Sequence, residues 1–174
     1  MEILEAEMKL EEFNNQGQEK IREDLFKCCG SSSWLEKLMK HFPFHTVENL
    51  KQHSDQSWLS CKKSDWLEAF SHHPKIGEKI GEINKHKATK EWAEQEQSGV
   101  KNANQNILDE LDQTNKEYLT KFGYIFIVCA SGKSASEMLE LLKLRIDNKS
   151  DCEIKIAAAE QNKITNLRID KLFI

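Results

Sequence analysis

The sequence predicts an all-α protein: one domain over residues 1–174, built as a bundle of about seven to nine helices. Turn-forming residues are scarce, with 2 prolines and 7 glycines. Charged residues make up 31% of the chain and the mean hydropathy is -0.66, which is typical of a helical protein with a polar surface. No internal repeat or low-complexity linker divides the chain, and 174 residues suffice for one hydrophobic core.

Four helices are expected in the first half of the chain, each from a capping residue and apolar residues at helical spacing. The first begins at Asn14 or Asn15 and ends at Gly30. The others begin at the serine cluster 31–33, at Thr46 and at Ser64. The last of these ends at the histidine pair 72–73, because Pro74 disfavours helical geometry in the residue before it.

The second half is expected to hold further helices around one apolar run. A short helix begins at Thr89 and stops at Gly99, and Trp92 and Glu96 share one of its faces. A longer helix carries Val100, Ile107, Leu111 and Tyr118. The run "YIFIVCA", residues 124–130, has the β-branched content of a buried strand but no evident partner strand, so we expect a buried irregular or helix-start segment.

Two capping boxes predict the last two helices. Ser134 with Glu137 opens one of them, and Ser150 with Glu153 opens the other. Apolar residues of the final helix share a face that Arg168 continues and that extends to Leu172. A buried guanidinium needs an anionic partner, which for Arg168 is either an internal carboxylate or a carboxylate of a ligand.

Composition excludes several classes of function. The formal charge of -4 and the lack of a basic block argue against nucleic acid as a partner. No apolar stretch approaches the roughly 18 residues that a membrane span needs. The acidic amphipathic start is unlike a signal peptide, and the end "KLFI" lacks a peroxisomal address. Five cysteines without a CxxC pair read as reduced thiols, so we expect a cytoplasmic protein without a structural zinc site.

His73 and Glu96 are the candidates for proton chemistry. An imidazole held at the end of a helix by Pro74 has a pKa range suited to proton transfer at neutral pH, although most loop histidines are simply solvated. Glu96 beside Trp92 can line a pocket or lie on a solvated helix face.

Of two other motifs, one is rejected and the other is disfavoured. "SGKS", residues 131–134, has Ile127 where a phosphate-binding loop needs glycine. A metal site could draw on histidines 41, 45, 72 and 73, but Pro43 interrupts the helical spacing of the first two and no HExxH occurs. We therefore expect no metal site and no nucleotide bound through this loop.

Several ordered motifs resemble one known family. They are "LFKCCGSSSWLEKLMKHFPF", "WLEAFSHHPKIGE", "EWAEQEQSGV", "NKEYLTKFGYIFIVCASGKSASEMLELLKLRIDN" and "NKITNLRIDKL". Together they cover about residues 10–172 and resemble 2-oxo-4-hydroxy-4-carboxy-5-ureidoimidazoline (OHCU) decarboxylase, the last enzyme of the route from urate to allantoin.

The resemblance implies an all-helical, cofactor-independent homodimer that converts OHCU to (S)-allantoin. It places the catalytic residues at His73 and Glu96. The implied substrate-binding positions are Pro74, Ala93, Gln97, Phe126, Ile127, Val128, Cys129, Ala130 and Arg168. Ala93 stands where many members have serine, so one hydrogen bond to the substrate is replaced or lost. Coupling to a hydroxyisourate hydrolase, which supplies the unstable substrate, is left open.

Three alternatives remain at this point. The chain could be a non-enzymatic helical interaction module, a metal-dependent hydrolase that uses the histidines, or the same fold acting on another ureido or imidazoline compound.

Overall fold

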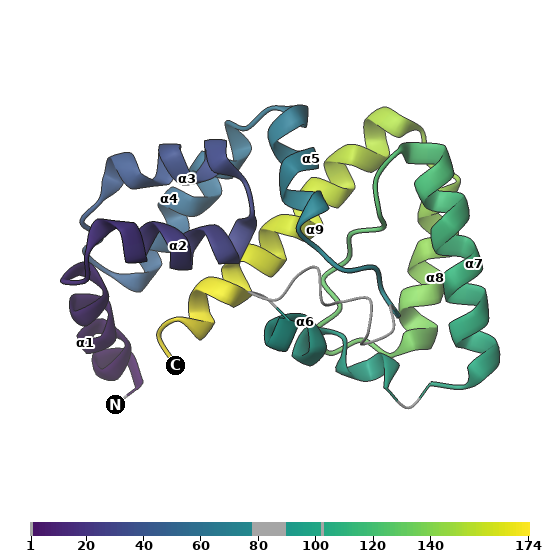
Figure 1. Ribbon diagram of the computed structural model, residues 1–174, viewed down its shortest axis with the longest axis horizontal. Coiled ribbons are helices and arrows are strands. Elements are labelled where there is room, and N and C mark those ends of the chain that lie inside the picture. Colours follow the sequence, from purple (N-terminus) through teal and green to yellow (C-terminus); the bar gives the residue numbers. More distant parts are fainter. Residues whose placement is uncertain (1, 78–89, 102) are drawn as a thin grey trace. The chain divides into compact units, whose positions relative to one another are not determined.

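The computed structural model describes residues 2–77, 90–101 and 103–174 (Figure 1). Within these ranges every regular element is a helix, which confirms the all-α prediction. The chain forms two compact units: Met1–Ala69 with Asn162–Ile174, and Phe70–Gln161. None of the helices in the described ranges is both long enough and apolar enough to span a bilayer.

The first unit contains the N-terminal helices and the end of the chain. Its elements are α1 (Glu2–Asn14), α2 (Gln18–Cys29), α3 (Ser32–Leu38), the 3-10 helix η1 (Met39–His41), α4 (Val47–Leu59), most of α5 (Lys63–Ser71) and residues 162–171 of α9 (Ser150–Lys171). The second unit contains the end of α5, α6 (Lys90–Glu96), the 3-10 helix η3 (Ser98–Val100), α7 (Gln105–Phe122), α8 (Ala135–Ile146) and residues 150–161 of α9.

Side-chain caps confirm two of the four predicted beginnings in the first unit, and α5 begins at Lys63, one residue before the predicted Ser64. The Ser31 hydroxyl accepts a hydrogen bond from the Trp34 amide, and Thr46 does the same for the Asn49 amide at 2.9 Å. Gly30 ends α2 with a φ of 81°, a left-handed conformation that glycine adopts without strain.

The predicted start of α2 is wrong. Gly17 occupies its cap position, and Asn14 is instead the last residue of α1. The Asn14 side chain donates to the Phe44 carbonyl at 2.7 Å and accepts from the Phe44 amide at 3.3 Å. Phe44, 30 residues away in sequence, therefore bonds to the side-chain amide of Asn14, which does not cap α2.

The core of the first unit forms where α2, α3 and α4 pack together. Trp34 is fully buried, and so are Ile21, Leu25, Leu38 and Leu50 on the same three helices. Its indole Nε1 donates to the Ser54 carbonyl at 3.1 Å, so burial of the ring leaves no unpaired donor.

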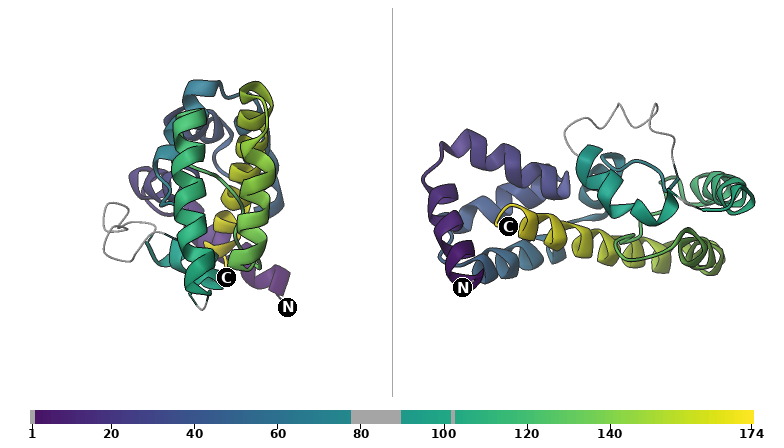
Figure 2. Two further views of the ribbon diagram at one scale, coloured as in Figure 1. Left: turned by 90° about the vertical axis from the view of Figure 1, so that its right-hand side faces the viewer. Right: turned by 90° about the horizontal axis from the view of Figure 1, so that it is seen from below.

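The second unit is organised by α7 and α8, which lie side by side (Figures 1 and 2). Segment 124–130 lies in the connection between α7 and α8. It has neither helical nor strand structure, as predicted. It is buried through aromatic contacts. The Phe126 ring meets Tyr118 edge to face at 5.3 Å, and Tyr124 lies 5.4 Å from Phe70.

Several boundaries in the second unit differ from the predictions. Val100 lies in η3 rather than in the long helix, which begins only at Gln105. α6 ends at Glu96, so Gly99 does not stop it. The predicted cap Thr89 lies outside the described residues.

Only one of the two predicted capping boxes is present. Ser134 and Glu137 form theirs in full. Ser150 instead lies within α9, and the carboxylate of Glu153 bonds to side chains of α7 and α8. Leu172 lies one residue beyond the end of α9.

Candidate functional site

The histidine pair lies where the sequence places it, just beyond a helix. α5 ends at Ser71, and the His73 amide donates to the Phe70 carbonyl at 3.2 Å. His72 is exposed, whereas His73 is half-buried with its Nε2 atom enclosed. Pro74 is buried and prevents the helix from continuing. His73 is thus the imidazole of the pair that is held against the protein.

Two side-chain amides hold the chain that follows Pro74. Gln97 accepts from the Gly77 amide at 3.1 Å and donates to the Lys75 carbonyl at 3.4 Å. Asn115 of α7 donates to the Ile76 carbonyl at 3.2 Å. Gln97, predicted to contact substrate, therefore fixes the backbone next to His73 in this structure.

Glu96 lies at the end of α6, and its charge contributes to the raised pKa of the Cys129 thiol. Burial raises the pKa of the Cys129 thiol, and the charges of Glu160 and Glu96 raise it further while Lys133 opposes them. Cys129 is consequently a neutral thiol at ordinary pH and a poor nucleophile. Ala93, one turn earlier in α6, is buried.

Gly99 in η3 lies very close to Lys133, which follows the apolar segment. A Cβ atom at this position would lie 2.1 Å from the Lys133 carbonyl oxygen. Only a residue without a side chain allows η3 to approach the turn that follows Ala130 so closely. The structure therefore brings the region of Glu96 and Gln97 next to the end of the apolar segment.

Charged side chains hold the backbone of the apolar segment. Arg145 donates to the Ile127 carbonyl at 2.7 Å, and Glu160 accepts from the Cys129 amide at 2.8 Å. Lys133 donates to the Cys129 carbonyl at 2.9 Å. Phe126, Ile127, Val128, Cys129 and Ala130 are all buried. Without helix or sheet partners, these backbone groups rely on side chains to satisfy them.

The sequence interpretation missed a buried ionic cluster behind this segment. Glu153 is fully buried and accepts from Arg145 Nη2 at 2.6 Å, from Tyr118 at 2.5 Å and from Asn148 at 2.7 Å. The available signal was Arg145 itself, which continues the apolar face of α8. The argument applied to Arg168, that an arginine on such a face needs an anion, holds equally there.

Arg168 belongs to the first unit, unlike the other predicted site residues. It is buried, and its Nη1 donates to the Lys27 carbonyl at 3.3 Å. Its predicted role toward the substrate stays a prediction.

The described residues contain no cluster of three or more metal-ligating His, Cys, Asp or Glu side chains. His41 instead stacks on His53, with ring centroids 3.9 Å apart.

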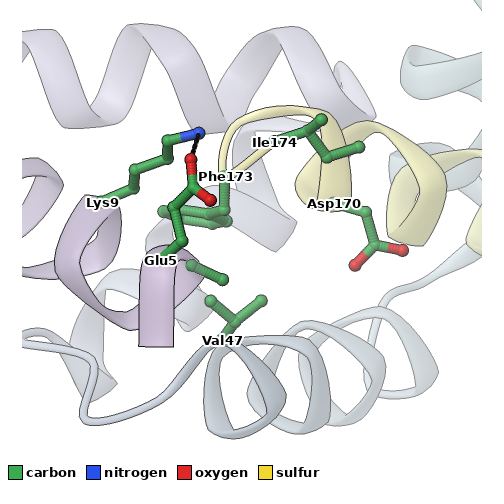
Figure 3. Close-up of a pocket in the computed structure, with 7 residues that line it drawn as sticks. Glu5, Lys9, Val47, Asp170, Phe173 and Ile174 are labelled. Atoms are coloured by element: carbon green, nitrogen blue, oxygen red, sulfur yellow. Dashed lines mark ion pairs between the residues drawn. The ribbon is translucent and has the colours of Figure 1, made fainter. Parts of the chain in front are cut away.

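A cavity of about 590 Å³ lies in the first unit between α1, the start of α4 and the C-terminal residues (Figure 3). It contains none of the predicted site residues. Its Lys9 pairs with Glu5 at 3.4 Å, and its Asp170 pairs with Lys51 at 2.8 Å. Its charges are thus mutually compensated, and the candidate site remains the cluster in the second unit.

Comparison with known proteins identifies close relatives. The chain is 41% identical over 155 residues to the uric acid degradation bifunctional protein TTL of Arabidopsis thaliana, covering 88% of this chain and 48% of that protein. It is 23% identical to a 2-oxo-4-hydroxy-4-carboxy-5-ureidoimidazoline decarboxylase of Halalkalicoccus jeotgali, covering 96% of this chain and 93% of that one. The chain thus spans about half the length of the plant relative, and it spans 32% of a bifunctional uric acid degradation protein from a Bacillus strain.

A solved structure matches as well. The crystal structure of an OHCU decarboxylase in the presence of (S)-allantoin superposes with a TM-score of 0.70 at 39% identity, covering 86% of this chain and 97% of that one. The family model for OHCU decarboxylase matches residues 14–170. Because this match spans both compact units and nearly the whole sequence, the chain belongs to the OHCU decarboxylase family.

Proposed function

We propose that the chain catalyses decarboxylation of OHCU to (S)-allantoin, a step of urate degradation. The observation that carries the proposal is the 39% identical OHCU decarboxylase structure, of which this chain covers 97%. We further propose that the two compact units act as one domain, supported by a family match that runs through both without a break.

The chemistry needs a rigid site more than a reactive group. In OHCU one ring carbon carries the carboxylate and a hydroxyl and is bonded to the carbon of a C=N bond. When the bond to the carboxylate breaks, carbon dioxide leaves and the electron pair moves toward the C=N bond. The nitrogen of that bond takes up a proton. The resulting enol becomes a ketone as its hydroxyl loses a proton and the neighbouring ring carbon gains one. The face from which this proton arrives decides the handedness of allantoin, so the ring must be held in one orientation.

His73 is proposed to move that proton. It is half-buried and anchored by the buried Pro74 and by Gln97 bonding to the backbone two and four residues beyond it. A positioned histidine contributes to proton transfer near neutral pH because its ordinary pKa lies close to that pH. Glu96, whose charge acts on the apolar segment, is proposed to orient N–H groups of the substrate.

The segment 126–130 is proposed to bind the ring through its backbone. Protein side chains already occupy the Ile127 carbonyl and the amide and carbonyl of Cys129. We therefore expect the substrate contacts of this segment to come chiefly from Phe126, Val128 and the amide of Ala130. Pro74 and Ala93 are proposed to shape the same pocket by their bulk, since both are buried.

The remaining proposals rest on the family resemblance. Arg168 binds an anionic or carbonyl oxygen of the substrate, Gln97 contacts the ring, and the protein is a cytoplasmic homodimer. A hydroxyisourate hydrolase supplies its substrate.

Turnover of freshly made substrate tests the function. OHCU is generated from urate with urate oxidase and hydroxyisourate hydrolase, and circular dichroism follows the product. We expect a fast, one-handed allantoin signal above the slow racemic background of the spontaneous reaction. Background rates alone from folded protein would contradict the proposed function.

A further inference from the structure

Arg145 joins the apolar segment to a fixed carboxylate. Its Nη1 donates to the Ile127 carbonyl at 2.7 Å, while Nε and Nη2 both donate to Glu153 Oε1, at 2.8 and 2.6 Å. Its Cζ also lies 4.5 Å from the centroid of the Phe126 ring. One planar guanidinium thus fixes both a backbone carbonyl and a neighbouring ring.

Glu153 cannot easily change its position. Besides Arg145 it accepts from the Tyr118 hydroxyl at 2.5 Å and from Asn148 Nδ2 at 2.7 Å, and its exposed fraction is 0%. Burial and the hydrogen bond to Glu153 raise the pKa of Tyr118 far above its ordinary range, so the phenol remains a donor at all ordinary pH values. Donors from α7, α8 and the α8–α9 connection therefore hold one carboxylate.

Stability alone does not account well for this arrangement. A buried ion pair is often no better for stability than well-packed apolar side chains, because both charges lose their hydration. Segment 126–130 lacks the hydrogen-bonding ladder of a helix or sheet, so its position depends on the few side chains that reach it.

We infer that Arg145 is a positioning residue: anchored by Glu153, it sets where segment 126–130 presents its backbone to the substrate. The inference deepens the proposed function and rests on it. Lysine cannot substitute, because a single ammonium group does not provide the planar fork that reaches Glu153 and Ile127 together.

The test uses Arg145→Lys with Lys143→Met as its control. Lys143 lies two residues earlier in α8 and forms an exposed ion pair with Glu110 at 2.5 Å, so its loss removes a charge from the same helix but not from the cluster. In Arg145→Lys we expect the KM for OHCU and the dissociation constant of (S)-allantoin to rise, and kcat/KM to fall by about 100-fold. A smaller folded fraction lowers the apparent kcat but leaves KM unchanged, so a raised KM separates positioning from simple destabilisation.

Amide hydrogen exchange gives a second readout that needs no turnover. The Cys129 amide, bonded to Glu160 at 2.8 Å, is expected to exchange faster in Arg145→Lys, while amides of α4 in the first unit keep their wild-type rates. An unchanged KM, or unchanged exchange at Cys129 in folded Arg145→Lys, would overturn the inference. If wild-type protein does not turn over OHCU, the proposed function fails while the exchange result still decides the anchoring.

A milder variant covers the case in which Arg145→Lys does not fold. Tyr118→Phe removes one donor to Glu153 and leaves the ion pair in place. We expect a raised KM and faster exchange at Cys129, both smaller than for Arg145→Lys. Wild-type values of both would overturn the inference.

Discussion

Two non-helical segments of the second unit, residues 73–77 and 126–130, are held by different chemistry. Neutral side-chain amides of Gln97 and Asn115 bind the first. Charged side chains of Arg145, Glu160 and Lys133 bind the second. Hydrogen bonds between neutral groups contribute about 0.5–1.5 kcal/mol each, and those to charged groups about 1.5–3 kcal/mol.

Burial differs in the same direction. All five residues of 126–130 are buried, whereas His73 and Lys75 are half-buried and Gly77 is exposed. We propose that 126–130, the more buried and more strongly bonded segment, is the template for the substrate ring, and that 73–77 carries the proton-transfer group. In the proposed site, one wall is thus held by charged side chains and the other by neutral side-chain amides.

The largest expected effect is on the rate and comes from segment 73–77. His73→Ala should lower kcat by about two to four orders of magnitude, the usual range for loss of a positioned acid or base. His72→Ala, with its exposed neighbouring imidazole, should keep turnover close to the wild-type value. Initial rates from the circular dichroism assay decide this, and equal losses in both variants would remove His73 from its proposed role.

The largest expected effect on stability comes from the buried cluster that holds segment 126–130. Glu153→Ala leaves Arg145 buried without its carboxylate and should lower the free energy of unfolding by about 3–5 kcal/mol. Glu110→Ala, which breaks the exposed pair with Lys143, should cost less than about 1 kcal/mol. Urea unfolding of both variants measures the difference. Similar costs would mean that the buried cluster is no stronger than a surface ion pair.

A smaller effect is expected where η3 approaches the turn that follows Ala130. Gly99→Ala forces its Cβ against the Lys133 carbonyl, 2.1 Å away if nothing moves. We expect a loss of about 1–3 kcal/mol, typical of overpacking, accompanied by a raised KM because the turn after Ala130 must shift. Gly17→Ala, where a Cβ meets nothing within 4 Å, is the control. If Gly99→Ala has wild-type stability and KM, this contact does not position the turn after Ala130.

The mildest effect concerns alkaline pH. Burial raises the pKa of the Cys29, Cys61 and Cys129 thiols above the usual 9.0. Below pH 9 these thiols are protonated in both states and the pH does not affect stability through them. Above pH 9 the unfolded chain loses protons that the native protein keeps, so stability falls as the pH rises.

Urea unfolding of the reduced protein at pH 8 and pH 10 checks this sign. Cys29→Ala should reduce the fall between the two values, because Cys29 is fully buried and its pKa is raised mainly by desolvation. A free energy of unfolding that stays constant or rises between pH 8 and pH 10 would contradict it.

The sequence predicts the helices well where their signals are local. Caps such as Ser31, Thr46 and Ser134 act on amides within three residues, so the pattern contains all the information that is needed. The same local reasoning fails at Glu153. There a capping-box pattern is present, but Arg145 and Tyr118 offer the carboxylate buried partners from other helices.

For a similar reason, sequence patterns indicate only part of the candidate site. The proline after His73 and the apolar character of 124–130 are visible in the sequence, and so is the need of a buried arginine for a partner. The partners that fix the apolar segment lie far along the chain, 18 residues from Ile127 to Arg145 and 31 from Cys129 to Glu160. Periodicity and capping rules do not extend over such separations, so only the fold reveals them.

We propose that one ligand contacts both segments. Amide hydrogen exchange of the wild-type protein with and without (S)-allantoin tests this most directly. We expect slower exchange in both 73–77 and 126–130 when allantoin is bound, with α4 unchanged as an internal reference. Protection of only one segment, or of neither at saturating allantoin, would contradict the claim that they form a single site.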